Sequence, residues 1–403
     1  MFLGGSMMQL PAIKYAREQN YYTILCDYLP DNPGQYYSNE YHCVSTTDKE
    51  AILDIAKKSN IDGILAYISD SASPTAAYVA NKLNLTSYPY ESVQILTKKD
   101  LFRHFLLENG FNCPRAEGFR TIKDARKNLH KFYFPLIIKP VDSSGSRGVS
   151  KINNVEEFDA AFEYAISYSR ENIVIIEEYI EKSHKYQIGG DVFIVDGKLD
   201  FCGLLNCHRN NEVNPFIPVG KSYPILLDKE KTELVRYEIQ KVINLLNLKT
   251  GPLNIEIILG DNQKPYIIEI GPRNGGNLIP HFLEMVTGVD LIKATVETAL
   301  GNRDINVHYV PKKEYYATYT IHSSNEGKLA GILFENEIKE NIVEKYFFKE
   351  KGSTIDIFNA GNKALGFVFL KFKSMEELEC KMERMNQYIK VQLTQKEEMI
   401  PNN

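Results

Sequence analysis

The sequence predicts a protein of mixed class, with an α/β region first and α+β regions after it, and three observations carry that prediction. The first ninety-odd residues alternate strand-like runs with helix-like runs, as parallel α/β sheets do. Beyond them the chain changes to short apolar strands joined by turns and helices. At 403 residues the chain is also too long for one ordinary hydrophobic core.

Composition excludes several classes of protein. Hydrophobic residues make up 43% and charged residues 25%, and the net charge of -5 gives no basic field for nucleic acid or an anionic membrane. The six cysteines form no CxxC pair, and the eight histidines are scattered, which argues against structural zinc. Neither a signal-peptide pattern nor a span of about 20 apolar residues is present. We therefore expect a cytoplasmic protein with reduced thiols and neither a nucleic-acid nor a membrane partner.

The first 95 residues predict a Rossmann-like domain. Strand-like YYTILCDY and DGILAY alternate with helix-like LPAIKYAREQ, KEAILDIAKK and PTAAYVANKL. The opening GGSMM differs from GxGxxG, so this loop does not predict a dinucleotide site and more simply shapes a tight turn.

Two further domains are expected. Residues 96–302 begin with the helical KKDLFRHFLLENG and contain the strands FPLIIKPV and NIVIIEEYI and a hairpin around Asp196 and Gly197. Within them, residues 121–200 predict a small α+β lid subdomain. Residues 303–403 mix strands with one amphipathic helix, MEELECKMERMNQYIK, and predict a C-terminal α+β domain.

The most informative feature is a pair of glutamates. Glu256 in LNIEIIL and Glu269 in PYIIEIG flank the turn-like GDNQKP, so the segment predicts a β-hairpin. An even-numbered loop centred between Asn262 and Gln263 would place the two glutamates directly opposite each other on one face. An odd loop would place them on opposite faces.

Directly opposed like charges in a sheet are destabilising, since their Cβ atoms lie about 4.5 to 5.5 Å apart. A divalent cation between two carboxylates reverses the sign of that interaction. All-oxygen ligands favour magnesium or manganese over zinc, and magnesium usually also keeps waters and substrate phosphates. The pair therefore suggests a metal–nucleotide site, and the alternative is two solvated charges on an outward strand face.

A second motif suggests phosphate binding. Lys139 ends the apolar run PLIIKPV, where a buried lysine needs an anionic partner. The glycines and serines of DSSGSRGV follow at once and can bring backbone N–H groups and hydroxyls to an anion. Lying between two expected strands, this loop would close over phosphates as a flap, and the alternative is a flexible hairpin tip. The residues concerned are Ser143, Ser144, Gly145, Ser146 and Gly148.

Two weaker features lie nearby. Glu177 and Glu178 interrupt the apolar strand IVIIEEYI, where a carboxylate could accept from an adenine amino group beside free backbone groups. An exit from strand to loop explains the same pattern. Lys99 and Arg103 share a helix face and could present two cations inward, or form a solvated face.

Taken in order, these motifs resemble the ATP-grasp superfamily over roughly residues 1–300. The tail resembles the closing C-terminal unit of biotin carboxylase-like and glycinamide ribonucleotide synthetase-like members. The resemblance implies that ATP and Mg²⁺ (or Mn²⁺) are the cofactors, with Glu256 and Glu269 bridging the metal. It also implies roles for the nucleotide-binding and catalytic residues: phosphate contacts from Lys99 and Lys139 under the Ser143–Gly148 loop, adenine binding by Glu177, Glu178 and Ile180, and a catalytic Arg273 that stabilises an acyl-phosphate or substrate carboxylate.

The sequence departs from the family pattern at two places. Gly271 stands where the family often has Asn, so a further metal ligand would come from Asn274, water or phosphate. In SHKYQIGGD, Lys185 or Gln187 stands at an expected ribose-binding Glu, which leaves Asp191 as the substitute.

The resemblance implies an ATP-dependent ligase that activates a carboxylate as an acyl-phosphate and joins it to an amine, releasing ADP and phosphate. Catalysis would be mostly positioning and charge neutralisation, with Lys139 and Arg273 as the catalytic cations. The partners expected are a small-molecule carboxylate and amine, and a homodimer is one expected assembly because relatives with a similar tail are often dimers. The alternatives are a purine-pathway ligase of the phosphoribosylglycinamide synthetase type, a biotin-type carboxylase, or a non-catalytic ATP-binding scaffold.

Overall fold

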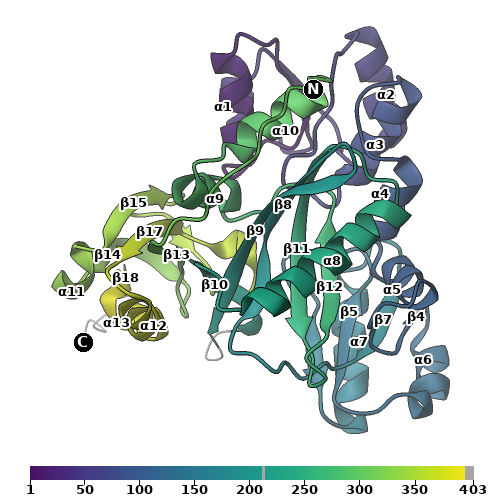
Figure 1. The fold of residues 1–403 in the computed structure, drawn as a ribbon, viewed down its shortest axis with the longest axis vertical. Helices are drawn as coiled ribbons and strands as arrows, with labels where there is room; N and C mark the ends of the chain where they lie inside the picture. Colours follow the sequence, from purple (N-terminus) through teal and green to yellow (C-terminus); the bar gives the residue numbers. More distant parts are fainter. Residues whose placement is uncertain (211–213, 395–403) are drawn as a thin grey trace, which may run out of the picture. The chain divides into compact units, whose positions relative to one another are not determined.

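The computed structural model describes residues 1–210 and 214–394 (Figure 1). By its internal contacts the chain divides into two compact units. The first comprises Met1–Asn206 and Ile225–Lys312, and the second comprises Cys207–Pro224 and the segment from Lys313 onward. Within the described residues no helix is both long enough and apolar enough to cross a membrane.

The N-terminal segment is the Rossmann-like α/β layer that the sequence predicts. Its three short strands are parallel, in the order β1-β2-β3. The expected strand in DGILAY is reduced to a single bridge, Phe2 to Leu65. The elements are β1 (Phe2–Leu3), α1 (Leu10–Glu18), β2 (Ile24–Asp27), the 3-10 helix η1 (Pro33–Tyr37), β3 (Glu40–Cys43), α2 (Lys49–Lys58) and α3 (Ser73–Lys82).

A separate four-stranded sheet forms the small layer expected near residues 121–200. Its strand order is β4-β7-β5-β6, and Phe158 and Phe162 of α7 pack into its core with Leu136 and Ile138 of β5. The elements are β4 (Ala116–Phe119), α6 (Ile122–Asn128), η2 (Leu129–Lys131), β5 (Leu136–Pro140), β6 (Ser150–Ile152), η3 (Val155–Glu157), α7 (Phe158–Ile166) and β7 (Val174–Glu178).

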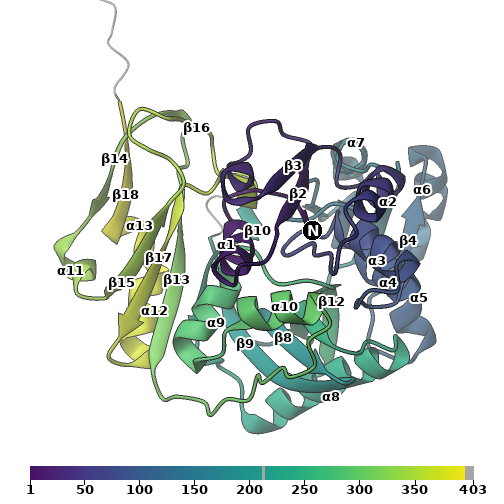
Figure 2. The same cartoon turned by 90° about the horizontal axis from the view of Figure 1, so that it is seen from above.

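The large antiparallel sheet of the first unit carries the glutamate hairpin. Its strands run in the order β12-β11-β8-β9, and Asp196 and Gly197 form the expected β8–β9 turn with positive φ angles. Helix α8 packs against one face with α4 and α5, and α9 and α10 lie against β8 and β11 (Figure 2). The elements are α4 (Tyr90–Thr97), α5 (Lys99–Glu108), β8 (Gln187–Val195), β9 (Lys198–Asn210), α8 (Lys229–Leu245), β11 (Gly251–Leu259), β12 (Pro265–Gly271), α9 (Ile279–Thr287) and α10 (Leu291–Ala299).

Strand β11 shows how this sheet orients the site. Leu253, Ile255 and Ile257 point into the apolar core that α8 covers. Because side chains alternate along a strand, Glu256 lies on the opposite face, away from that core. A carboxylate at this position therefore stays accessible to ligand while its neighbours stabilise the sheet.

The second unit is α+β, as expected for the C-terminal region. Its strands run in the orders β10-β13-β17-β15 and β16-β14-β18. The single helix predicted over residues 375–390 is wrong, because Arg384 interrupts it and Ile389 pairs with Phe334 of β14. The elements are β10 (Asn214–Tyr223), β13 (Tyr315–Ile321), β14 (Gly327–Phe334), α11 (Asn336–Lys339), β15 (Ile342–Phe347), β16 (Thr354–Ile355), η4 (Gly361–Lys363), β17 (Gly366–Phe372), α12 (Met375–Glu383), α13 (Met385–Tyr388) and β18 (Ile389–Leu393).

Candidate active site

The hairpin of β11 and β12 places the two glutamates directly opposite each other, Glu256 against Glu269. Nearer the turn the pairing is shifted by one residue, with Ile257 opposite Ile267. Ile268 is therefore the extra residue of a β-bulge. The loop is odd, and the prediction that an odd loop places the two glutamates on opposite faces is wrong, because the bulge restores the register that brings the carboxylates together.

Arg103 of α5 holds this bulge. Its Nη2 donates to the carbonyl oxygen of Ile268 at 2.7 Å, and its Nη1 to that of Ile267 at 3.3 Å. Only 3% of Arg103 is exposed, so the inward orientation is correct for this residue and the solvated-face alternative is not. A bulge disrupts the ladder locally, and the guanidinium satisfies the carbonyls there.

Each glutamate of the pair has a polar neighbour. Gln187 Nε2 donates to Glu256 Oε2 at 2.7 Å, and Lys99 Nζ lies 3.8 Å from Glu269 Oε1. Lys99 also donates to the carbonyl oxygen of Ser143 at 2.7 Å. Its ammonium therefore contacts both Glu269, a candidate metal ligand, and the start of the glycine loop.

The donor set fits magnesium. Two carboxylates face the same side, and Mg²⁺ is commonly held by one or two carboxylates together with waters and substrate phosphates. Across residues 1–210 and 214–394, no three His, Cys, Asp or Glu side chains gather closely enough to hold a metal by themselves. Asn274 is fully buried and its Oδ1 accepts from Thr295 Oγ1 at 2.8 Å, which leaves water or phosphate as the better further ligand.

Lys139 lies in a buried charge cluster with Glu177 and Arg103. Its Nζ is 2.7 Å from Glu177 Oε2, and Arg103 Nε is 2.9 Å from Glu177 Oε1. Burial lowers the pKa of Lys139 in spite of the nearby carboxylate. Burial acts upward on the pKa of Glu177, but Arg103 and Lys139 outweigh it, so that pKa lies below its ordinary value.

These contacts change the interpretation of the adenine segment. The carboxylate of Glu177 faces the two cations, and that of Glu178 accepts from the Tyr133 backbone N–H at 3.0 Å. The backbone N–H groups of Glu178 and Tyr179 are bonded to the carbonyls of Arg115 and Pro135. Ile180 is the next residue, and its N–H donates to no residue that the structure describes. The backbone N–H of Ile180 is thus better placed to bind the adenine base than the side chain of either glutamate.

The glycine loop joins the antiparallel strands β5 and β6, as the flap prediction requires. Gly145, Ser146 and Gly148 have φ angles of 67°, 59° and 74°, in the left-handed region. A Cβ on Gly148 would lie 3.1 Å from atoms of Pro140 and Tyr168, so only glycine fits there without strain. Arg147 Nε donates to the carbonyl of Ser144 at 3.1 Å across the loop.

Asp191 has a different environment from the one its ribose-binding prediction needs. It is 0% exposed, and its carboxylate accepts from the Gly275 backbone N–H, at 2.9 and 2.8 Å, and from Asn254 Nδ2 at 2.8 Å. A ribose hydroxyl has no open surface of Asp191 to reach. The contacts favour an anchoring role for the loop that follows Arg273.

Arg273 is held by a residue that sequence reasoning missed. Its Nε and Nη2 donate to Asp70 Oδ1 and Oδ2 at 2.8 and 2.5 Å, a bidentate pair. A Cβ on Gly271 would lie 2.8 Å from Asp70 Oδ1 and 3.0 Å from the Arg273 guanidinium. The glycine at this departure from the family pattern therefore makes room for the ion pair. Asp70 lies in no motif that would have revealed it.

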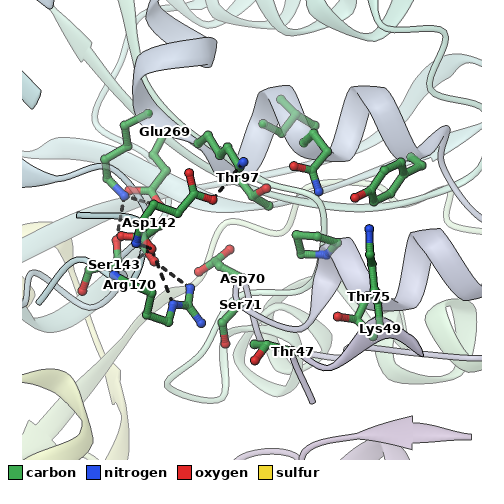
Figure 3. A pocket seen from close by; sticks show the side chains of 17 residues that line it. Thr47, Lys49, Asp70, Ser71, Thr75, Thr97, Asp142, Ser143, Arg170 and Glu269 are labelled. Atoms are coloured by element: carbon green, nitrogen blue, oxygen red, sulfur yellow. Dashed lines mark hydrogen bonds and ion pairs between the residues drawn. The ribbon is translucent and has the colours of Figure 1, made fainter. Parts of the chain in front are cut away.

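A cavity of about 350 Å³ lies in the first unit beside these groups (Figure 3). Three predicted residues line it, namely Lys99, Ser143 and Glu269. Asp70 and other residues of the N-terminal segment line it as well. The same cavity is therefore lined by the candidate metal ligand Glu269, by Ser143 of the glycine loop and by Asp70, which holds Arg273. Further lining residues include Thr47, Lys49, Ser71, Thr75, Asp142, Arg170 and Glu171.

Residues 97–277 match the family model described as the ATP-grasp domain. This chain carries an ATP-grasp domain. The match confirms the ATP-grasp resemblance that the sequence motifs indicated for these residues. It covers the glutamate hairpin, Lys99, Lys139, the glycine loop and Arg273.

Curated relatives include carbamoyl phosphate synthase large chains. The chain is 24% identical over 262 residues to that of Thermoanaerobacter sp. strain X514, covering 63% of this chain and 23% of the relative. It is 24% identical over 301 residues to the C-terminal section of the large chain from Aquifex aeolicus, covering 72% and 53%. The chain thus spans from about a quarter to about half of the length of these relatives.

Solved structures resemble the chain over almost its whole length. An L-amino acid ligase from Bacillus licheniformis has a TM-score of 0.82 at 19% identity, covering 98% of both chains. A phosphoribosylglycinamide synthetase from Anaerococcus prevotii has a TM-score of 0.75 at 23% identity, also covering 98% of both. At these identities the likeness establishes the fold.

The buried charge cluster yields a prediction on stability. Glu177→Gln is expected to lower the free energy of unfolding by about 3 kcal/mol at neutral pH, because it leaves two buried cations without a carboxylate. The pKa of Glu177 is lowered by folding. The ionised Glu177 therefore stabilises the folded protein at pH values above its unfolded-state pKa, about 4. This contribution is lost as the pH falls through the folded-state pKa.

Denaturant unfolding of wild type and variant at pH 7 and in acid measures this difference. The two proteins should converge in acid. Glu178→Gln is the matched control, and we expect it to cost less than about 1 kcal/mol, since that carboxylate is only partly buried and bonds one backbone amide. A difference between wild type and Glu177→Gln that stays constant or grows in acid would contradict the assigned ion pairs.

Proposed function

We propose that the protein is an ATP-dependent, ADP-forming ligase that joins a carboxylate to an amine. The carboxylate attacks the γ-phosphate of ATP to give an acyl-phosphate and ADP, and the amine then displaces phosphate to give an amide or peptide-like bond. The observation that carries the proposal is the opposed pair Glu256 and Glu269, placed on one face by the Ile268 bulge beside Lys99. The 1–95, 96–302 and 303–403 domain division and a homodimeric assembly are part of the same proposal.

We assign the nucleotide to residues on three elements. Lys99 and Lys139 contact its phosphates, and the loop from Ser143 to Gly148 closes over them with its backbone N–H groups. The hinge at Ile180 offers a backbone donor to the base. Glu177 serves the site indirectly by holding Lys139 at 2.7 Å.

Glu256 and Glu269 would hold Mg²⁺, which neutralises phosphate charge when bound. Lys99 lies close enough to Glu269 to balance that carboxylate before nucleotide arrives. The rest of the catalysis is positioning and electrostatic stabilisation, and it requires no nucleophilic side chain of the protein.

Arg273 would bind the substrate carboxylate or the acyl-phosphate, with Asp70 as its positioning residue. A guanidinium has five N–H donors. In the described structure two go to Asp70 and one to the Asn274 carbonyl, which leaves two for a ligand. This arrangement supports a charge-stabilising role and argues against a scaffold that merely grips ATP.

The defining experiment measures ADP and phosphate release with ATP and Mg²⁺ against a panel of amino acids, small carboxylates and phosphoribosyl amines, with mass detection of condensed products. Amino acids come first because the L-amino acid ligase is among the similar folds. Release that requires both a carboxylate and an amine is expected. Turnover with a phosphoribosyl amine would instead support the purine-pathway alternative, and ATP binding without turnover on any pair would support the scaffold.

Glu269→Gln is expected to reduce Mg²⁺-dependent turnover at least about 100-fold, because it removes one of the two carboxylates proposed to hold the metal. Steady-state ADP release across a magnesium titration measures the effect. Asp261→Asn, in the exposed turn of the same hairpin, is the control and should behave as wild type. Unchanged turnover and magnesium dependence in Glu269→Gln would remove the metal assignment.

The Asp70–Arg273 pair gives a prediction on turnover. The direction of the change in kcat tells whether Asp70 positions Arg273 for the substrate or blocks it. Asp70→Asn is expected to lower kcat about 10- to 100-fold with ATP affinity unchanged, since partners that orient an active-site group typically contribute that much. Arg273→Ala should lower kcat further. Steady-state kinetics with calorimetric ATP binding provides both readouts, and the exposed Asp54→Asn is the control. A rise in turnover on Asp70→Asn would mean that Asp70 blocks Arg273.

A further inference from the structure

A lysine and a cysteine that have no role in the proposals above meet in the interior of the second unit. Lys221 Nζ lies 2.7 Å from Cys207 Sγ. Lys221 is 6% exposed and Cys207 is 2% exposed. Hydrogen bonds between nitrogen and oxygen most often measure about 2.9 to 3.0 Å, and sulfur is larger than oxygen. The two side chains are therefore in unusually close contact.

No carboxylate within the described residues lies within ion-pair distance of Lys221 Nζ, and the Cys207 sulfur is the side-chain atom that Nζ contacts. A buried ammonium is costly without an anionic or polar partner. The sulfur of Cys207 is thus the polar side-chain atom that faces the buried Nζ of Lys221.

The backbone fixes the pair. Cys207 belongs to β9 and Lys221 to β10, and β10 pairs with β13 with Lys221 opposite Thr318. The Lys221 backbone N–H donates to Thr318 Oγ1 at 3.1 Å. This bond to a side chain adds to the pairing between β10 and β13. Both side chains therefore project from strands whose backbones are held in a sheet.

We propose that Cys207 and Lys221 form a redox-controlled covalent cross-link through one oxygen atom, an N–O–S bridge, when the protein meets peroxide. A bridging oxygen joins atoms at this separation with little movement, whereas a direct N–S bond would require them to approach much closer. The inference is independent of the ligase proposal, because it concerns neither the nucleotide nor the metal residues.

The chemistry uses two equivalents of peroxide. The first transfers one oxygen to the Cys207 sulfur, giving a sulfenic acid, and its other oxygen leaves as water. In the second step Lys221 reacts as a free amine: the sulfenic O–H and one N–H are broken, an N–O bond forms, and the second peroxide becomes two waters. Sulfur and nitrogen together lose four electrons, and the two peroxides gain four. Reduction by four thiol groups, which become two disulfides, would return the free lysine and cysteine and release the bridging oxygen as water.

The test is intact-mass and peptide analysis of the full chain, fully reduced and then treated with hydrogen peroxide. The expected product gains one oxygen and loses two hydrogens, about 14 Da, joins the Cys207 peptide to the Lys221 peptide, and disappears after dithiothreitol. Cys207→Ser and Lys221→Arg should each abolish the link. Cys202→Ser, which removes another buried thiol of the same strand, should retain it.

Three results would overturn the proposal. One is oxidation of Cys207 to sulfenic or sulfinic acid with no attached lysine. The second is a link that persists in Lys221→Arg. The third is an unmodified Cys207 under conditions that oxidise the exposed Cys43 and Cys380. Thermal melting checks that the variants are folded, and the wild-type peptide map decides the matter even if one of them is not.

Discussion

The candidate site depends on one extra residue in one strand. A slip of a single residue in a β-ladder moves every following side chain to the other face of the sheet. Without the bulge at Ile268, the odd turn of the hairpin would send Glu269 toward the apolar core that Ile267 and Ile270 occupy. The buried Arg103 bonds the carbonyls at the bulge. The pairing of the two carboxylates thus depends on a cation from a helix that is far away in the sequence but in contact with the bulge.

The same guanidinium also belongs to the cluster that holds Lys139. Arg103, Lys139 and Glu177, when ionised, leave one surplus positive charge in a buried place, and burial of such a charge is costly. An anion arriving near Lys139 would reduce that cost. Burial is the main cause of the lowered pKa of Lys139, and repulsion from Arg103 and Lys99 adds to it. Arg103 therefore couples the proposed phosphate end of the site to the proposed metal end through two sets of contacts on one side chain.

The sequence could predict the parts of the site that repeat a local pattern. Alternation along LNIEIIL and PYIIEIG placed Glu256 and Glu269 on a hairpin, and the apolar run before Lys139 indicated a buried cation. It could not predict the odd loop with its bulge, because the residue that holds the bulge lies more than 160 positions earlier. The helix expected beyond Met385 fails for a similar reason: pairing of Ile389 with β14 overrides helix propensity.

Gly271 illustrates why a departure from a family pattern needs its spatial neighbours before it is interpreted. Considered alone, it suggested a missing metal ligand. In space, the carboxylate of Asp70 lies where its side chain would begin, and that carboxylate fixes two donors of Arg273. Asp70 comes from the loop before α3, where the Ser73 hydroxyl bonds the Ser69 carbonyl. The glycine therefore lets the N-terminal segment orient the guanidinium. In the proposed function, the two N–H groups that remain on Arg273 would set the side from which the substrate carboxylate approaches.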